Sequence, residues 1–206
     1  MEVILAALSE AGLRDVEAPK LHGLAEAARV HDPDFLTFLE TAYPLWEKRH
    51  GASRAVFARV FGMRGLAQKP QMDNIDAMLS AYTFDIFSPF VPGTWTAIRS
   101  ALDVTLTAAG KVKAGAREAF ALCRPPGHHA SGDLAGGYCY LNNAAIAAQM
   151  FRDQGAARVA ILDIDYHHGN GTQRIFYDRD DVLFISLHGR PEEEYPFLLG
   201  FAHETG

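Results

Sequence analysis

Cysteine is scarce in this sequence, with only Cys123 and Cys139 among 206 residues. Two cysteines cannot build a disulfide framework of the kind that holds small secreted domains together, so we expect a cytoplasmic protein. Long apolar runs are also absent, and no basic segment leads into an apolar one at the N-terminus. We therefore expect neither a membrane span nor a signal peptide.

Positive charge is in short supply as well, because 19 Lys and Arg face 25 Asp and Glu, for a net charge of -6. This balance argues against a nucleic-acid-binding surface and is compatible with a cationic substrate. The fractions of hydrophobic residues, 49%, and of charged residues, 21%, are those of an ordinary globular protein. We expect residues 1–206 to form a single α/β domain.

The hydrophobic pattern predicts helices and strands in alternation. Helices are expected at 2–11, 33–50, 94–109, 141–154 and 172–177, and strands at 118–123, 158–165 and 181–188. Asp32 is the predicted N-cap of the second helix, and Gly110 the predicted C-terminal stop of the third. Alternation of this kind implies a parallel sheet covered by helices on both faces.

Residues 52–92 break the pattern, because glycines and prolines interrupt every helical or strand periodicity there. We predict a long surface loop used for function or assembly. A disordered connector is the alternative, but the segment contains six Phe and Tyr residues, too many for one. Asp73 and Asp76 in this segment would contact a cationic substrate or lie on a solvated face.

The most informative stretch is 161–171, Ile-Leu-Asp-Ile-Asp-Tyr-His-His-Gly-Asn-Gly. If the strand persists to its end, Asp163, Asp165 and His167 point to the same side, because alternate side chains share a face. Carboxylates and an imidazole that converge in this way call for a counter-charge, and zinc accepts both ligand types. The plainer alternative is that Asp165 and His167 cap the following turn. The two glycines of the stretch are predicted to let the chain turn sharply.

A second histidine pair, His128-His129, follows the strand predicted at 118–123. Because sites form at the carboxyl ends of parallel strands, both pairs can reach one cleft. Adjacent side chains diverge, so we interpret this pair as acid/base groups rather than metal ligands. Ordinary loop histidines are one alternative. A structural zinc site of Cys123, His128 and Cys139 is another, although no Cys-x-x-Cys pair supports it.

Three motifs resemble the zinc-dependent histone deacetylase superfamily, most closely the bacterial acetylpolyamine amidohydrolases. They are Arg124-Pro-Pro-Gly-His-His-Ala130, Gly136-Gly-Tyr-Cys-Tyr-Leu-Asn-Asn143 and Asp163-Ile-Asp-Tyr-His-His-Gly-Asn-Gly171. The resemblance covers most of the chain. It implies an arginase/deacetylase-like three-layer α/β fold, incomplete in this chain, whose parallel sheet is flanked by helices. It also implies zinc-dependent removal of acetyl groups from N-acetylated amines.

The same resemblance implies a role for individual residues. Asp165 and His167 would be zinc ligands, and His128 and His129 would transfer protons, oriented by Asp163 and Asn170. Asp163, Ser186 and Leu187 would form a monovalent-cation site for K⁺. Gly137 and Tyr138 would form a wall of the substrate tunnel. Many relatives have Asp where this chain has Asn170, so His129 should be less basic here. Asn170 could instead be a simple turn former, and Ser186-Leu187 a plain strand end.

The sequence also departs from the family. In the family a third zinc ligand, an aspartate, and an oxyanion-stabilising tyrosine lie beyond the point that matches Gly206, and a first strand precedes the match to Met1. The resemblance therefore implies a partial site and an inactive chain when it is alone. Residues 52–92 resemble an insertion that narrows the site and forms a dimer, which favours acetylpolyamine substrates and a homodimer.

Three other functions stay open at this point. The chain could belong to an acetyl-lysine protein deacetylase, with the same chemistry on a different substrate. It could be a non-catalytic module that holds an acetylated ligand in a deacetylase-like cleft. Arginase-like hydrolysis of an amidino group is the third, but two-metal sites need more Asp and His ligands than this sequence shows.

Overall fold

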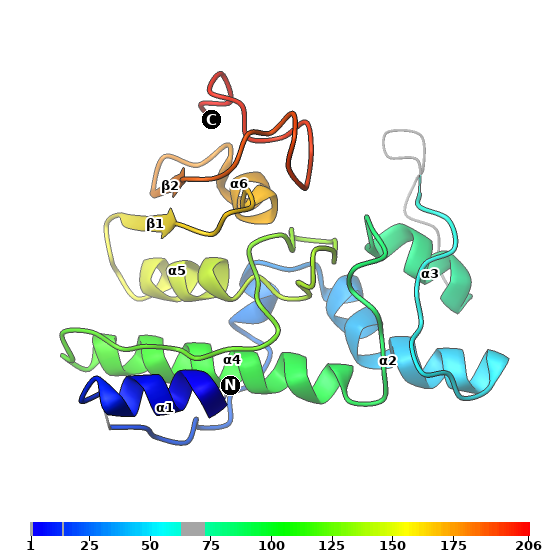
Figure 1. Ribbon diagram of the computed structural model, residues 1–206, viewed down its shortest axis with the longest axis horizontal. Coiled ribbons are helices and arrows are strands. Elements are labelled where there is room, and N and C mark those ends of the chain that lie inside the picture. The colour runs from blue at the N-terminus through cyan, green and yellow to red at the C-terminus, as the bar shows by residue number, and fades with distance from the viewer. Residues whose placement is uncertain (1, 14, 63–72) are drawn as a thin grey trace.

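The computed structural model describes residues 2–13, 15–62 and 73–206. Its elements are α1 (Glu2–Glu10), the short 3-10 helix η1 (Ala27–Arg29), α2 (Pro33–His50), α3 (Ile75–Tyr82), α4 (Thr94–Lys113), α5 (Asn143–Asp153), β1 (Val159–Asp163), α6 (Asn170–Phe176) and β2 (Val182–Ser186). In Figure 1 the strands, α5 and α4 lie in successive layers, and α2 and α3 lie together at one side. No helix in the described part is both long and apolar enough to span a membrane.

The two strands form a parallel sheet whose register pairs Val159 with Val182 and Asp163 with Ser186. Side chains alternate between the two faces of a strand, and one face packs against α5 and α6. The other face leaves apolar side chains exposed: Leu162 at 62%, Leu183 at 59% and Ile185 at 42%. The predicted parallel sheet with helices is confirmed. Among the described residues, helices cover one face of this sheet.

The prediction of a surface loop at 52–92 is wrong for residues 75–82, which form the helix α3. Asn74 caps α3 by accepting a hydrogen bond from the backbone N–H of Asp76, and Ile75, Met78, Leu79 and Tyr82 of that helix are buried. These apolar positions have the spacing of a helix, so the sequence does contain the signal for α3. The surrounding prolines and glycines led us to predict a loop instead. The buried residues of α3 belong to the main core, where aromatic rings of α2 and α3 meet. Residues 63–72 lie outside the described part.

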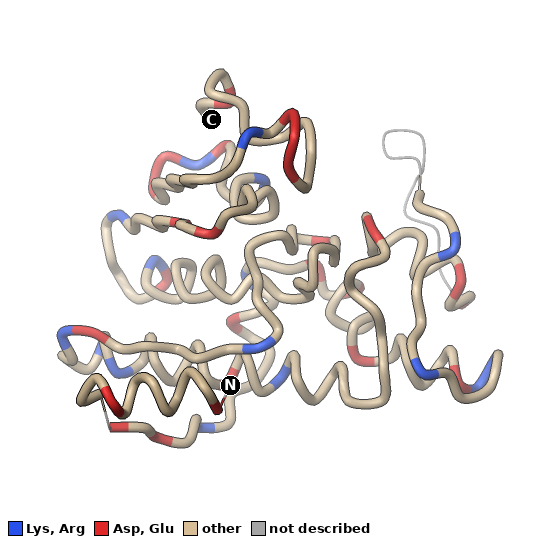
Figure 2. Tube along the Cα trace, viewed as in Figure 1, with Lys and Arg blue, Asp and Glu red and all other residues tan. Residues whose placement is uncertain are grey.

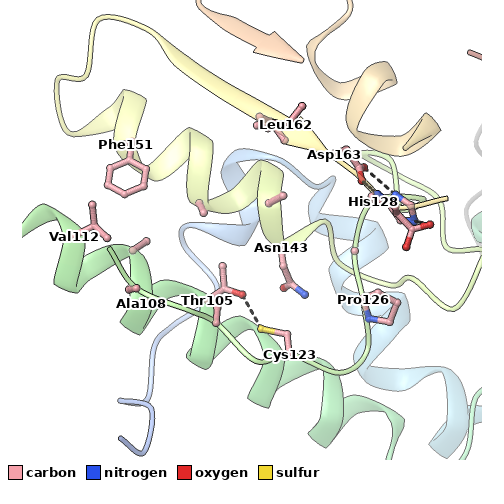
Figure 3. Close-up of a pocket in the computed structure, with 18 of the residues that line it drawn as sticks. Thr105, Ala108, Val112, Cys123, Pro126, His128, Asn143, Phe151, Leu162 and Asp163 are labelled. Atoms are coloured by element: carbon pink, nitrogen blue, oxygen red, sulfur yellow. Dashed lines mark hydrogen bonds and ion pairs between the residues drawn. The ribbon is translucent and has the colours of Figure 1, made fainter. Parts of the chain in front are cut away.

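The strand predicted at 118–123 does not form. Cys123 at its end lies against α4, where its Sγ is 3.3 Å from Thr105 Oγ1 and 3.4 Å from the carbonyl oxygen of Ala101. A cavity of about 820 Å³ separates this segment from β1 (Figure 3). An extended segment without a hydrogen-bonded neighbour among the described residues is not a strand, however apolar its sequence.

Most of the predicted helix positions are confirmed, with changes at their ends. Asp32 caps α2 as expected, because its side chain accepts from the N–H of Asp34. By contrast, α4 continues past Gly110 to Lys113, so the predicted stop is wrong. Gly110 has open space around it, so nothing in its surroundings ends the helix.

Candidate active site

His128 and His129 lie side by side, each with a partner on Nδ1. His128 Nδ1 is 2.9 Å from Asp163 Oδ2, and His129 Nδ1 is 2.7 Å from Asn170 Oδ1. The two ring centroids are 4.0 Å apart. The structure therefore brings together the four residues that the sequence assigned to proton transfer and its support.

The backbone around this pair is held from α6. The carbonyl oxygen of His128 accepts hydrogen bonds from the N–H groups of Gly171, at 2.9 Å, and Thr172, at 3.1 Å. The approach is close, because a Cβ on Gly171 would lie 2.3 Å from the carbonyl oxygen of Ala130. A Cβ on Gly169 would lie 2.4 Å from Asp163 Oδ2. Both glycines are therefore needed for close packing. At Gly169 φ is -77°, a value open to any residue, so the sharp turn that we predicted does not explain the need for glycine there.

Burial makes His129 a neutral imidazole. Removal of the ring from water, with the neighbouring His128, lowers the pKa of His129 to about 4. Asn170 Oδ1 can only accept, so the ring proton of the neutral form lies on Nδ1 and leaves Nε2 free to take a proton. A neutral imidazole with a free Nε2 can accept a proton at neutral pH, which is what a general base has to do.

Asp163 keeps its charge in spite of burial. Desolvation raises the pKa of its carboxyl, but the hydrogen bond and charge of His128, together with the N–H of Asp165, outweigh that effect and lower the pKa overall. Asp163 therefore offers His128 a negatively charged partner, whereas Asn170 offers His129 a neutral one.

Asp165 and His167 lie just beyond β1, in a bend rather than on a strand. The strand ends at Asp163, whose Oδ1 accepts the N–H of Asp165 at 3.1 Å, and Asp165 Oδ1 accepts the N–H of His167 at 2.8 Å. The expectation that strand alternation aligns the three side chains is wrong, because these side-chain-to-backbone bonds replace the strand. His167 Nδ1 nevertheless lies 3.4 Å from Asp165 Oδ1.

The donor chemistry of Asp165 and His167 suits a divalent metal such as zinc, since the two side chains are adjacent and about half exposed, at 51% and 42%. Among the described residues, no group of three or more His, Cys, Asp or Glu side chains could hold a metal. The part of the chain that we describe therefore supplies two donors. The alternative zinc site of Cys123, His128 and Cys139 is wrong for the same reason.

The residues predicted to bind a monovalent cation lie next to one another across the sheet. Asp163 and Ser186 are register partners, and the carbonyl oxygen of Asp163 accepts the N–H of Leu187 at 2.9 Å. Ser186 Oγ lies 2.9 Å from His188 Nδ1. The proximity agrees with the prediction, but the binding of a cation there stays a prediction.

Gly137 and Tyr138 lie beside the histidines, both at positive φ, 54° and 64°. A Cβ on Gly137 would lie 2.2 Å from the ring of His129. The Tyr138 side chain is exposed, and its ring centroid is 6.1 Å from that of Phe87. This position suits the predicted wall of a substrate tunnel, a role that stays a prediction.

Sequence analysis missed Tyr195 and Asp85. The Tyr195 ring lies edge-on to His129, with centroids 4.9 Å apart, and its hydroxyl donates to Asp85 Oδ2. Burial and the bond to Asp85 raise the pKa of Tyr195, so the phenol stays protonated. Nothing in the sequence spacing links these two residues, which lie 110 positions apart.

Asp76, which the sequence offered as a contact for a cationic substrate, forms ion pairs with two residues of α2. His50 Nε2 lies 2.9 Å and Arg49 Nε 3.2 Å from its Oδ2. The hydrogen bond to His50 is the main reason that the pKa of Asp76 is lowered. Asp76 therefore belongs to an ion-pair cluster with α2.

Among known protein families, the histone deacetylase domain matches residues 1–206 of this chain. The chain belongs to the histone deacetylase family. It is 51% identical over 205 residues to acetylpolyamine amidohydrolase 2 of Pseudomonas aeruginosa, a match that covers 100% of this chain and 59% of that protein. It is 49% identical over 205 residues to acetylpolyamine amidohydrolase of Mycoplana ramosa, covering 100% of this chain and 60% of that protein.

Solved structures agree with the family and the fold. The crystal structure of acetylpolyamine aminohydrolase from Burkholderia pseudomallei matches 98% of this chain with a TM-score of 0.89 at 42% identity, and the match covers 58% of that protein. The chain thus spans less than two thirds of the length of the relatives that it matches.

Proposed function

We propose that the protein hydrolyses the acetamide of N-acetylated amines, with acetylpolyamines as its substrates. The observation that carries this proposal is the pair of supported histidines, His128 on Asp163 and His129 on Asn170, beside Asp165 and His167. The names of the relatives, acetylpolyamine amidohydrolases at about half identity, support the substrate class. The deacetylation of acetyl-lysine proteins is the alternative within the same chemistry.

The residues of this chain supply the proton transfers. His129 Nε2, free because Nδ1 bonds to Asn170, takes the proton of the attacking water. His129 then passes this proton to the leaving amine, and His128, held by the carboxylate of Asp163 and adjacent to His129, assists both transfers. The Tyr195 ring and Gly137 pack against His129, whose side chain is buried.

Zinc and a monovalent cation complete the proposal. Asp165 and His167 would hold zinc, which when bound supplies a Lewis acid for the acetyl carbonyl and for water. Asp163, Ser186 and Leu187 would hold K⁺ under the site. A third zinc donor must come from outside the described residues, so we propose that this chain is inactive by itself.

A cationic substrate is consistent with the charge around the site. Figure 2 marks a run of acidic residues along the loop after β2, where the sequence has Glu192, Glu193 and Glu194 in succession. Glu194 accepts a hydrogen bond from Tyr166, the residue before His167, at 2.7 Å. Arg190 pairs with Glu192 and Glu193, and the negative charge that remains on this loop would attract a positively charged polyamine tail.

The test is acetate release by the full-length natural protein, loaded with zinc, from N-acetylputrescine and from an acetyl-lysine peptide. Faster turnover of acetylputrescine supports the proposal, and faster turnover of the peptide supports the alternative. Binding of both ligands without acetate release would instead favour a non-catalytic module.

We also propose that the protein is a cytoplasmic homodimer that binds neither nucleic acid nor membranes. The support is the balance of charge and the resemblance of residues 52–92 to a dimer-forming insertion. Light scattering of the full-length protein would give a single dimer-sized species. A monomer would contradict the dimer.

A further inference from the structure

Asp85 accepts three hydrogen bonds from three separate segments. Its Oδ1 accepts the N–H of Phe87 at 2.9 Å, within its own loop. Its Oδ2 accepts the N–H of Gly137 at 2.8 Å, and also the hydroxyl of Tyr195. One half-buried carboxylate thus ties the loop before α4, the loop after His129 and the loop after β2 to one point.

The Tyr195 ring that is tied down in this way touches the proposed active site directly. It stands edge-on to His167, with centroids 5.9 Å apart and planes at 80°, as it does to His129. It also stands edge-on to Phe87, at 5.8 Å and 84°. The ring therefore separates the histidines from the exposed aromatic side chain of Phe87.

The wall that results has little spare room. A Cβ on Gly137 would lie 2.8 Å from the Tyr195 hydroxyl as well as 2.2 Å from the ring of His129. Tyr195 and Gly137 therefore pack closely against His129, and an outward movement of the Tyr195 ring would open space beside that histidine.

We infer that Asp85 is a positioning residue that assembles this wall: its hydrogen bonds to Gly137 and Tyr195 hold in place the two groups that pack against His129, and so support binding of the acylated amine. The inference rests on the proposed function, because it concerns the substrate cleft of that same site. A hydrogen bond from a hydroxyl to a carboxylate is stronger and shorter than a hydrogen bond between neutral groups. It therefore fixes the Tyr195 ring more firmly than packing alone. An untethered ring would leave the histidines in place but loosen substrate contacts.

The first test is Tyr195→Phe in the zinc-loaded full-length protein, which removes only the hydroxyl. We expect KM for N-acetylputrescine to rise about tenfold, equivalent to ~1.4 kcal/mol, with kcat within about twofold. Tyr43→Phe is the matched control, because Tyr43 also donates a part-buried hydrogen bond, to the carbonyl oxygen of Ser53 at 2.9 Å, on α2. An unchanged KM in Tyr195→Phe, or an equal rise in Tyr43→Phe, would overturn the inference.

The second test measures KM for Asp85→Ala alone and for the double variant with Tyr195→Phe. If the hydroxyl acts through Asp85, Tyr195→Phe adds little further change in KM once Asp85 is gone. If the two changes multiply, the two residues act independently and the inference is wrong.

Amide hydrogen exchange gives a readout that does not require activity. Asp85→Ala should accelerate exchange of the Gly137 N–H, which loses its acceptor, while the amides of α2 stay as protected as in the unmodified protein. If the unmodified protein releases no acetate, the proposed function is wrong. The exchange at Gly137 still tests whether Asp85 assembles the wall. Unchanged exchange at Gly137 would overturn the assembly by Asp85.

Discussion

Asn142 Nδ2 donates a hydrogen bond to the carbonyl oxygen of Ala130 at 3.0 Å, and so ties the start of α5 to the residue that follows the histidine pair. The same side chain caps α5 through the N–H of Ala145 and donates to Thr172 Oγ1 on α6. It is completely buried. One amide group thus fixes two helices and the loop that carries His128 and His129.

Replacing Asn142 by Ala should destabilise the protein by about 2–4 kcal/mol, because a cap is lost and buried acceptors lose their donor. Urea unfolding of the full-length protein measures the change. Asn74→Ala is the matched control, since among the described residues its side chain makes only the capping bond of α3. It should cost about 1 kcal/mol. Equal losses in the two variants would show that the buried contacts of Asn142 add nothing.

Gly171→Ala should abolish the native arrangement of the histidine loop. The new Cβ would meet backbone atoms of Ala130 at 2.3 and 2.4 Å, and backbone cannot move aside as a flexible side chain can. We expect a lower melting temperature and loss of acetate release. Gly110→Ala within α4 meets nothing within 4 Å and should stabilise the protein by about 0.5–1 kcal/mol. A neutral Gly171→Ala would contradict the packing that we describe.

Leu79→Ala tests whether residues 73–92 belong to the core. Leu79 is fully buried in α3, so its truncation should cost about 2–5 kcal/mol in unfolding free energy. Leu21→Ala is a fitting control, because Leu21 is 91% exposed and should change stability little. If Leu79→Ala lowers the unfolding free energy no more than Leu21→Ala does, residues 73–92 behave as a surface loop and our interpretation is wrong.

His31 should make stability depend on pH. Burial lowers the pKa of this histidine to about 4, and its Nε2 accepts the N–H of Asn142, which a protonated ring cannot do. The unfolded chain therefore binds the proton more readily than the folded one. Stability is complete above about pH 6.5 and falls as the pH drops toward 4, by about 3 kcal/mol at most.

His31→Gln removes this titration. The variant should be less stable at pH 7 but should lose less stability between pH 6.5 and 4.5 than the unmodified protein. Chemical unfolding at each pH measures both slopes. Parallel slopes would show that His31 does not contribute to the acid sensitivity.

The sequence predicted the site better than its surroundings, and the reason is physical. Asp163, Asp165 and His167 lie within five residues, so their proximity is set by local geometry that the sequence contains. The same holds for Asp32, whose capping bond spans two residues. Even so, the bend after β1 was not foreseen, because short side chains there capture backbone N–H groups that a strand would use.

Long-range relationships could not be predicted in the same way. The bond between Asp85 and Tyr195 joins residues far apart in the chain and follows only from packing. The strand expected at 118–123 failed because strand formation needs a neighbour, which no local pattern reveals. The buried state of α3 likewise depends on the aromatic residues of α2, to which the local sequence gives no clue.

The most direct test of our account is the rate of acetate release from N-acetylputrescine by the zinc-loaded full-length protein and its His129→Asn variant. Asparagine keeps a polar group but cannot act as the base, so we predict a loss of at least about a hundredfold in kcat. His203→Ala, an exposed histidine outside the site, should retain the full rate. If His129→Asn turns over as fast as the unmodified protein, the proton transfer that we assign to this site is wrong.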